Sequence, residues 1–232
     1  MESKEKIQVL VKENIITQEV ADKYSKAFTI FVDKIVDQLH GQGFYPEPNN
    51  MFRALNECPK PKVVILGQDP YHDGSANGLA FDNNFDTNKV SPSLKNILKE
   101  LFTDLEFDDG ELLEARREVY TSHLEHLPQQ GVLLLNTALT VKPKEAGSHT
   151  DIWKEFTDAI VDEINGQDDV AWIRWGTHAK AFQSRITNTS HYIITGVHPM
   201  PLAANRGGFF GGKYFSKTNA FLHTTNQSPI NW

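Results

Sequence analysis

The chain lacks the features of a membrane protein, a disulfide-stabilised secreted protein or a protein with a broad basic surface. It has a single cysteine, Cys58, in 232 residues, which excludes an internal disulfide and fits a reducing cytoplasm. No apolar run approaches the roughly 20 residues of a spanning helix, and the polar N-terminus holds no apolar signal core, so we expect no membrane contact. The net charge of −7 argues against a broad polyanion-binding surface. Any nucleic-acid contact must therefore be local, built from backbone N–H groups, hydroxyls and a few cations.

Several catalytic motifs are also absent. The chain holds no Gly-x-Ser-x-Gly elbow, no P-loop and no Gly-x-Gly-x-x-Gly fingerprint. Residues 206–212 are glycine-rich but follow no expected strand and carry no Lys-Ser pair. Metal-ligating residues cluster only at His72 and Asp73, which is too few for a metal site. We therefore expect an activity that needs no metal and no cofactor.

The apolar pattern predicts a single α/β domain over residues 1–232. Apolar residues make up 39% of the chain, which is enough for a substantial core. Helical spacing in residues 1–40 predicts N-terminal helices that pack on the sheet, and residues 41–232 form the α/β core. A charged, irregular segment with a helical middle is expected over residues 106–130. Buried strands are expected at residues 63–66, 132–135, 170–175 and 192–197, alternating with helices. This alternation predicts a central four-stranded parallel twisted sheet flanked by helices.

Polar residues follow three of the four expected strands. Gln68 and Asp69 come after the first, Asn136 after the second and His198 after the fourth. Taken singly, Asp69 beside a proline reads as a turn residue, and an isolated Asn or His after a strand is usually an ordinary loop residue. A parallel sheet gathers these ends at one edge, where ligands bind. A carboxylate, an imidazole and amides with nearby aromatic rings suit a planar heterocyclic ligand.

Five segments resemble the uracil-DNA glycosylase family. They are Gly-Gln-Asp-Pro-Tyr-His at 67–72, Gly-Leu-Ala-Phe at 78–81, Ser-Pro-Ser-Leu at 91–94, Gly-Val-Leu-Leu-Leu-Asn-Thr at 131–137 and His-Pro-Met-Pro-Leu at 198–202. Residues 216–219 and 229–232 are also similar to the family. The resemblance runs from about residue 45 to the C-terminus, while residues 1–40 match only as generic helices.

The resemblance implies a hydrolase that cleaves the N-glycosidic bond of deoxyuridine in DNA after base flipping. Free uracil would be released, leaving an abasic site and initiating base-excision repair. Asp69 would stabilise the oxocarbenium-like sugar and position water. His198 would donate a hydrogen bond to uracil O2 as a neutral imidazole. These two residues are the expected catalytic pair.

The resemblance also implies the base-binding residues and the DNA contacts. Asn136 would bond the uracil edge and reject cytosine, Tyr71 would occupy the space of a thymine methyl, Phe81 would stack on the ring, and Gln68 would contact the base through its main chain. Leu202 would enter the vacated base stack. The expected DNA-binding residues are Pro70, Ser91, Pro92, Ser93, Pro199, Pro201, Leu202 and Arg206. The expected partners of this monomer are uracil-containing single- and double-stranded DNA, and a protein inhibitor that mimics DNA.

Four residues depart from the family pattern. Met200 stands where Ser is usual, Asn77 replaces a common His, Gly147 replaces a usual Asn, and Gly208 is an extra residue after Arg-Gly. Arg174 is also unusual in a buried strand, and we expect its side chain to reach out at the strand end. None of these positions belongs to the expected catalytic or base-binding set.

Three alternatives remain open at this stage. A non-catalytic DNA-binding protein could retain the fold, although the intact polar set argues against it. A relative with broadened base choice would conflict with Tyr71 and Asn136. A metal-dependent phosphoesterase could use Asp69, His72 and Asp73, with only local support from the sequence.

Overall fold

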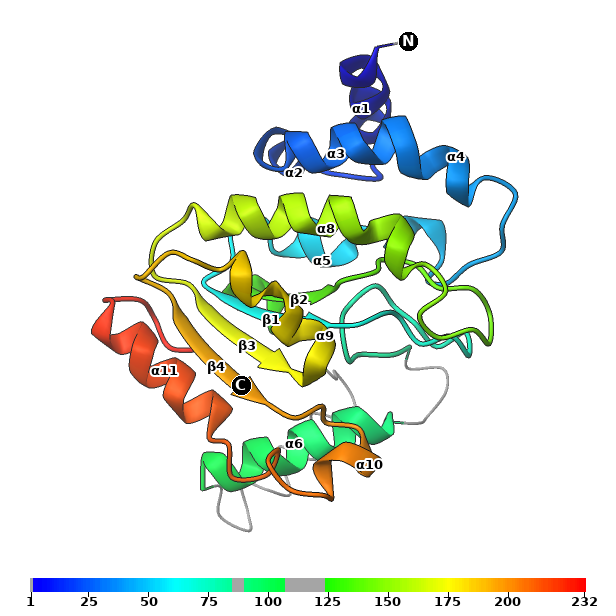
Figure 1. Cartoon of the computed structure of the whole chain (residues 1–232). Helices are drawn as coiled ribbons and strands as arrows, with labels where there is room; N and C mark the ends of the chain where they lie inside the picture. The colour runs from blue at the N-terminus through cyan, green and yellow to red at the C-terminus, as the bar shows by residue number, and fades with distance from the viewer. Residues whose placement is uncertain (1, 85–89, 107–123) are drawn as a thin grey trace.

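The computed structural model describes residues 2–84, 90–106 and 124–232. It contains a four-stranded, all-parallel sheet in the order β2-β1-β3-β4 (Figure 1). The strands are β1 (Val63–Gly67), β2 (Val132–Asn136), β3 (Ala171–Trp175) and β4 (Tyr192–Gly196). The predicted α/β class and strand order along the chain are confirmed, with strand boundaries shifted by one residue. The predicted helical middle of residues 106–130 falls on residues outside the described ranges.

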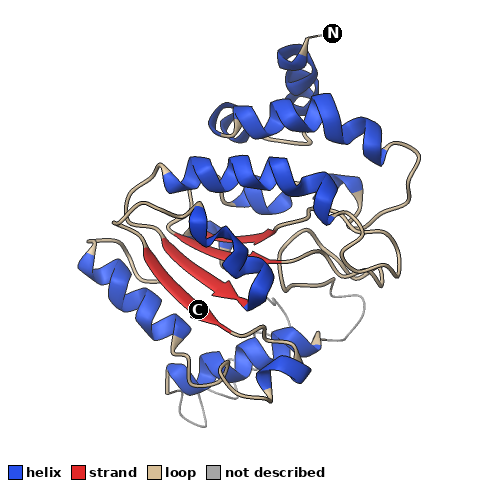
Figure 2. Ribbon diagram, in the orientation of Figure 1, coloured by secondary structure: helices blue, strands red, loops and turns tan. Residues whose placement is uncertain are grey.

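The sheet interior explains why the apolar runs form strands. Every residue of β1, β2 and β3 is buried, as expected for strands covered on both faces. Val63 of β1 lies opposite Val132 of β2 and Ala171 of β3. The same register carries Gly67 opposite Asn136. The carboxyl ends of the strands therefore lie level at one edge, where the connecting loops gather (Figure 2).

Helices cover both faces of the sheet. Figure 1 shows α8 on one face, with α6 and α11 on the other. The helices of this core are α5 (Arg53–Glu57), α6 (Pro92–Asp104), α8 (Thr150–Asn165), α9 (Gly176–Lys180), α10 (Pro201–Ala204) and α11 (Tyr214–Thr224). Short 3-10 turns occupy Pro48–Asn50, Pro128–Gln130 and Ala181–Ser184. Within the described part of the chain, no helix is long and apolar enough to cross a membrane.

The N-terminal helices form an outer layer above α8. They are α1 (Ser3–Lys12), α2 (Gln18–Lys23), α3 (Ser25–Ile30), a π-helical turn (Phe31–Ile35) and α4 (Val36–Leu39). The prediction that they pack on the sheet is wrong, because α3 packs against α8 (Figure 1). Phe31 stacks on Trp153 of α8 with centroids 5.8 Å apart, and Phe28 meets Phe156 of α8 edge to face at 5.5 Å.

Candidate active site

A cavity of about 160 Å³ lies at the carboxyl ends of the strands. It brings together all six residues expected to take part in catalysis or base binding, although they come from segments up to 130 positions apart. Its lining consists of Gly67, Gln68, Asp69, Pro70, Tyr71, His72, Ala76, Leu79, Phe81, Asp82, Ser93, Asn136 and His198. The loops after β1, β2 and β4 thus form one site.

Main-chain hydrogen bonds join the loop after β1 to the loop after β2. The Gly67 carbonyl accepts from Thr137 N–H at 3.0 Å, and the Gln68 carbonyl accepts from Ala138 N–H and the Thr137 hydroxyl, both at 2.9 Å. Because the Gln68 carbonyl is already engaged, any main-chain contact of Gln68 with a base falls to its N–H. These hydrogen bonds fix the positions of the two loops relative to each other at the cavity.

Gly67 lies so close to Asn136 that a side chain at residue 67 would displace the Asn136 amide. A Cβ on Gly67 would lie 2.2 Å from Asn136 Oδ1 and 3.0 Å from Ala80 Cβ. The amide of Asn136, which is only 7% exposed, therefore occupies the space a larger residue would take. The absence of a side chain at residue 67 is what lets the Asn136 amide lie across the strand end.

The half-buried Asp69 carboxylate is held by a main-chain donor. Gly147 N–H donates to Asp69 Oδ2 at 2.5 Å. Gly147 has φ +75°, a left-handed conformation that Gly and Asn adopt more readily than other residues. Glycine at this position therefore adopts, without strain, the backbone conformation that directs this N–H to Asp69. The sequence did not predict that residue 147 holds Asp69. The only indication in the sequence is that Gly and Asn both adopt left-handed backbone conformations readily.

The structure favours a neutral imidazole at His198. Burial lowers the pKa of His198 below its usual 6.5, the nearby His178 lowers it further, and Asp69 opposes the shift. Met200 N–H donates to His198 Nδ1 at 3.1 Å, which requires that nitrogen to be unprotonated. The proton of the neutral ring therefore resides on Nε2. Asn96 of α6 fixes the same loop by donating from Nδ2 to the Pro199 carbonyl at 2.8 Å.

Phe81 and Tyr71 form the aromatic part of the cavity. Phe81 adopts φ +68°, and its ring lies edge to face against Trp175, with centroids 5.5 Å apart. It also lies 5.9 Å from the His198 ring. The Tyr71 hydroxyl lies 2.6 Å from Ser91 Oγ and donates to the Phe81 carbonyl at 3.4 Å. Burial raises the pKa of Tyr71 to about 12, although the Ser91 hydrogen bond acts in the opposite direction. The support from Trp175 was not anticipated from the sequence.

The residues expected to contact DNA divide into exposed and buried groups. Leu202 is 71% exposed and Met200 is 41% exposed, on the segment that enters and begins α10. Pro92, Pro201 and Arg206 are also exposed, and Ser93 lines the cavity. Pro70, Pro199 and Ser91 are buried.

Two of the unusual residues now have a structural description. Asn77 donates from Nδ2 to Asp82 Oδ2 at 3.0 Å and accepts from Leu79 N–H at 3.1 Å, so it holds the loop before Phe81. The expectation that Arg174 reaches out at the strand end is wrong, because its side chain is only 3% exposed. Its Nε and Nη1 have no hydrogen-bond partner in the described structure, and burial lowers its pKa.

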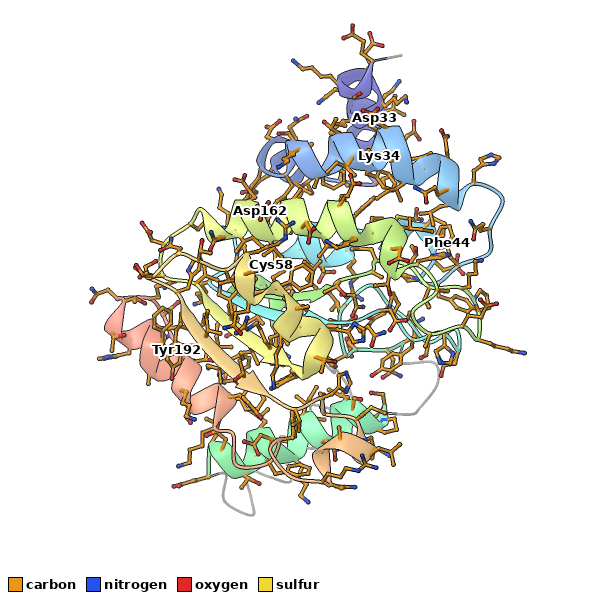
Figure 3. The ribbon with its side chains drawn as sticks, in the orientation of Figure 1. Asp33, Lys34, Phe44, Cys58, Asp162 and Tyr192 are labelled. Atoms are coloured by element: carbon orange, nitrogen blue, oxygen red, sulfur yellow. The ribbon has the colours of Figure 1, made fainter. Side chains whose placement is uncertain are left out.

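Two carboxylates of α8 form ion pairs away from the cavity lining. This helix connects β2 to β3, and Figure 3 shows Asp162 toward its C-terminal end. Asp158 accepts from Lys154 and Arg185, both at 2.7 Å, and Asp162 pairs with Arg185 at 2.9 Å. These carboxylates are neutralised locally and do not face the cavity.

The geometry offers little to the phosphoesterase alternative. Both the Ser75 N–H and the Ser75 hydroxyl donate to Asp73 Oδ1, at 3.0 and 2.6 Å. The Asp73 carboxylate therefore closes a local turn. Within residues 2–84, 90–106 and 124–232, no group of three or more His, Cys, Asp or Glu side chains gathers where it could hold a metal ion.

Comparison with known proteins gives consistent matches. A family model described as the uracil DNA glycosylase superfamily matches residues 55–223. The uracil-DNA glycosylase 1 of Listeria monocytogenes is 43% identical over 225 residues, which cover 95% of this chain and 96% of the relative. The crystal structure of mimivirus uracil-DNA glycosylase is similar with a TM-score of 0.79 at 26% identity, covering 95% of this chain and 88% of that chain. A variant of mimivirus UNG in complex with UGI has a TM-score of 0.77 at 26% identity, covering 95% of this chain and 90% of that chain.

Proposed function

The chain belongs to the uracil DNA glycosylase superfamily, and on that premise we propose that the cavity at its strand ends excises uracil from DNA through Asp69 and His198. Excision is hydrolysis of the bond between deoxyribose C1′ and uracil N1. The bonding electrons leave with the base and C1′ becomes cationic. Water then adds to C1′ and gives up a proton to solvent, and the uracil anion takes up a proton from solvent. The site must therefore stabilise a cation on the sugar and an anion on the base.

Asp69 supplies the negative charge for the sugar. Its Oδ2 is held by Gly147 N–H at 2.5 Å, and Oδ1 remains to accept a hydrogen bond from the attacking water. A carboxylate fixed in this way stabilises the developing cation without reorganising during the reaction. His198 acts on the other fragment. Its Nε2–H donates to uracil O2 as negative charge develops there, because Nδ1 is occupied by Met200 N–H.

Asn136 and Tyr71 select the base. An amide whose oxygen lies against Gly67 presents one donor and one acceptor, which pair with O4 and N3–H of uracil. Cytosine has an amino group at position 4 and an acceptor at N3, so the same amide meets a mismatched edge. Tyr71 fills the space beside C5 that a thymine methyl would need. Phe81, supported by Trp175, provides the stacking surface.

DNA engagement rests on exposed groups around the cavity. Leu202 projects from α10 and fills the gap that the extruded nucleotide leaves. Ser93 and Arg206 hold phosphates of the backbone around the flipped nucleotide. Prolines 70, 92, 199 and 201 have no N–H to donate, so their part is to fix the path of the loops that approach the DNA. Such contacts need little net positive charge, which reconciles DNA binding with a net charge of −7.

The convergence of Asp69, Asn136 and His198 on one cavity carries this proposal. The test is release of free uracil from single- and double-stranded oligonucleotides in excess EDTA. We expect release from both substrates and a roughly 100- to 1,000-fold lower kcat for Asp69→Asn, the size of effect seen when one electrostatic stabiliser is removed. Asp33→Asn, on the N-terminal helices, is the matched control and should retain activity. No release by the unsubstituted protein, or full activity in Asp69→Asn, would contradict the proposal.

The proposal extends to the substrate, the oligomeric state and the cellular compartment. The proposed substrate is uracil-containing DNA, handled by a monomer in the cytoplasm. The single buried cysteine is compatible with that compartment. A protein inhibitor that mimics DNA would occupy the surface around Leu202. Gel filtration in the presence and absence of oligonucleotide tests whether the protein is a monomer.

A further inference from the structure

Ser91 is poorly placed for the phosphate contact expected from its sequence position. It is only 9% exposed, and its hydroxyl is used inside the protein. Ser91 Oγ accepts from Leu94 N–H at 3.1 Å, which caps the start of α6, and it lies 2.6 Å from the Tyr71 hydroxyl. A hydroxyl committed to these two partners has little capacity left for DNA.

The hydrogen bonds form a chain that ends at the stacking residue. Tyr71 has one hydroxyl proton, and the carbonyl of Phe81, 3.4 Å away, can only accept. With that proton on the Phe81 carbonyl, Ser91 donates to Tyr71 and accepts from Leu94. The alternative, in which Tyr71 donates to Ser91, still leaves the short 2.6 Å bond in place. In either direction Ser91 fixes the position of the Tyr71 hydroxyl.

We propose that Ser91 is a positioning residue for base selection, which locks the Tyr71 ring against C5 of the flipped base through the 2.6 Å hydroxyl contact. The inference rests on the proposed function, because it assigns a role within the uracil cavity. A side chain that excludes C5 substituents by its bulk is selective only if its position is fixed. If the ring could tilt about its side-chain torsions, a larger C5 substituent would be admitted at small cost.

The location of Ser91 gives this contact a second consequence. Ser91 is the N-cap of α6, and Asn96 of that helix donates a hydrogen bond to the Pro199 carbonyl, next to His198. One helix therefore positions both the residue that excludes C5 substituents and the loop that carries the imidazole. Ser93, between them, lines the cavity. The first turns of α6 thus position the residues expected on two sides of the base, Tyr71 and His198.

The experiment measures selectivity for the size of the C5 substituent. Oligonucleotides carrying uracil, 5-fluorouracil or 5-bromouracil are compared by their kcat/KM ratios, in the unsubstituted protein and in Ser91→Ala, Tyr71→Phe and the double variant. Electronic effects of the substituent are common to all variants, so changes in the ratio report size selection. We expect Ser91→Ala and Tyr71→Phe each to lower the preference for uracil over 5-bromouracil by roughly threefold to tenfold, the value of one hydrogen bond. The double variant should show no further loss.

Two controls separate positioning from loss of stability. Thr17→Ala removes the cap of α2, where Thr17 accepts from Val20 N–H at 3.2 Å, and should lower the melting temperature without changing the preference. Ser91→Thr keeps the hydroxyl and should restore the preference. If Ser91→Ala fails to fold, Tyr71→Phe tests the same contact with the cap intact. An unchanged preference in active Ser91→Ala or Tyr71→Phe would overturn this inference alone, as would additive losses, whereas no uracil release by the unsubstituted protein would overturn the proposed function as well.

Discussion

Substitution of Gly67 by alanine should damage base recognition while leaving the fold intact. The new Cβ would lie 2.2 Å from Asn136 Oδ1, so the amide must rotate away. Gly67 is not among the residues with positive φ, so alanine is compatible with its backbone. Replacing glycine at such a position stabilises a protein by about 0.4–1 kcal/mol, which offsets the tight contact with Ala80 Cβ at 3.0 Å. We therefore expect the free energy of unfolding to change by less than about 1 kcal/mol.

The effect on activity follows from the hydrogen bonds that the amide would lose. Two bonds to the uracil edge at about 0.5–1.5 kcal/mol each amount to about 1–3 kcal/mol. Since 1.36 kcal/mol corresponds to a factor of ten, kcat/KM for uracil should fall roughly 5- to 150-fold. The preference for uracil over cytosine should fall with it, because the amide no longer tests the base edge.

Uracil-release kinetics and thermal melts of four variants test this reasoning: Gly67→Ala, Gly43→Ala, Asn136→Ala and the double variant of residues 67 and 136. Gly43→Ala is the matched control, since a Cβ there meets no described atom within 4 Å, and it should behave as the unsubstituted protein. In an Asn136→Ala background the clashing oxygen is gone, so Gly67→Ala should cause no further loss. Retention of full activity and selectivity by Gly67→Ala would refute the idea that this close approach fixes the amide.

Two other predictions concern buried titratable groups. Because burial and His178 lower the pKa of His198 below 6.5, kcat/KM should stay level near neutral pH and fall only as the pH drops through that lowered value. His178→Gln should move this acid limb to higher pH, and an unmoved limb would contradict the assignment. The same depressed pKa makes His198 contribute stability above pH 6.5 that is lost as the pH falls through the folded-state value. Arg174→Leu should raise the free energy of unfolding by about 1–3 kcal/mol, because it removes a buried charge with unpaired nitrogens. The melting temperature should then rise by roughly 2–12 °C. A lower melting temperature would show that the guanidinium has a compensating contact.

The sequence predicted the sheet well because burial on both faces leaves a plain pattern. Runs of apolar residues located all four strands to within one residue, and their polar ends do line one cavity. The N-terminal helices were predicted, but their packing partner was not, because periodicity identifies a buried face without identifying what covers it. Arg174 was misplaced for a related reason. An arginine in an apolar strand suggests that the side chain reaches solvent at the strand end. However, β3 lies between β1 and β4, and the residues next to Arg174 in the sequence do not show that the sheet face at this position is covered by other elements.

Two of the departures from the family pattern, Met200 and Gly147, fall where the main chain, and not the side chain, makes the contact. Met200 replaces a usual Ser, but it is the Met200 N–H that bonds His198 Nδ1, so the imidazole keeps its tautomer. Gly147 replaces a usual Asn, but its N–H holds Asp69, and glycine readily adopts the required left-handed conformation. A main-chain donor is indifferent to side-chain identity provided that the backbone follows the same path. The geometry proposed for Asp69 and His198 therefore rests in part on two main-chain donors, which do not depend on the side chains at residues 147 and 200.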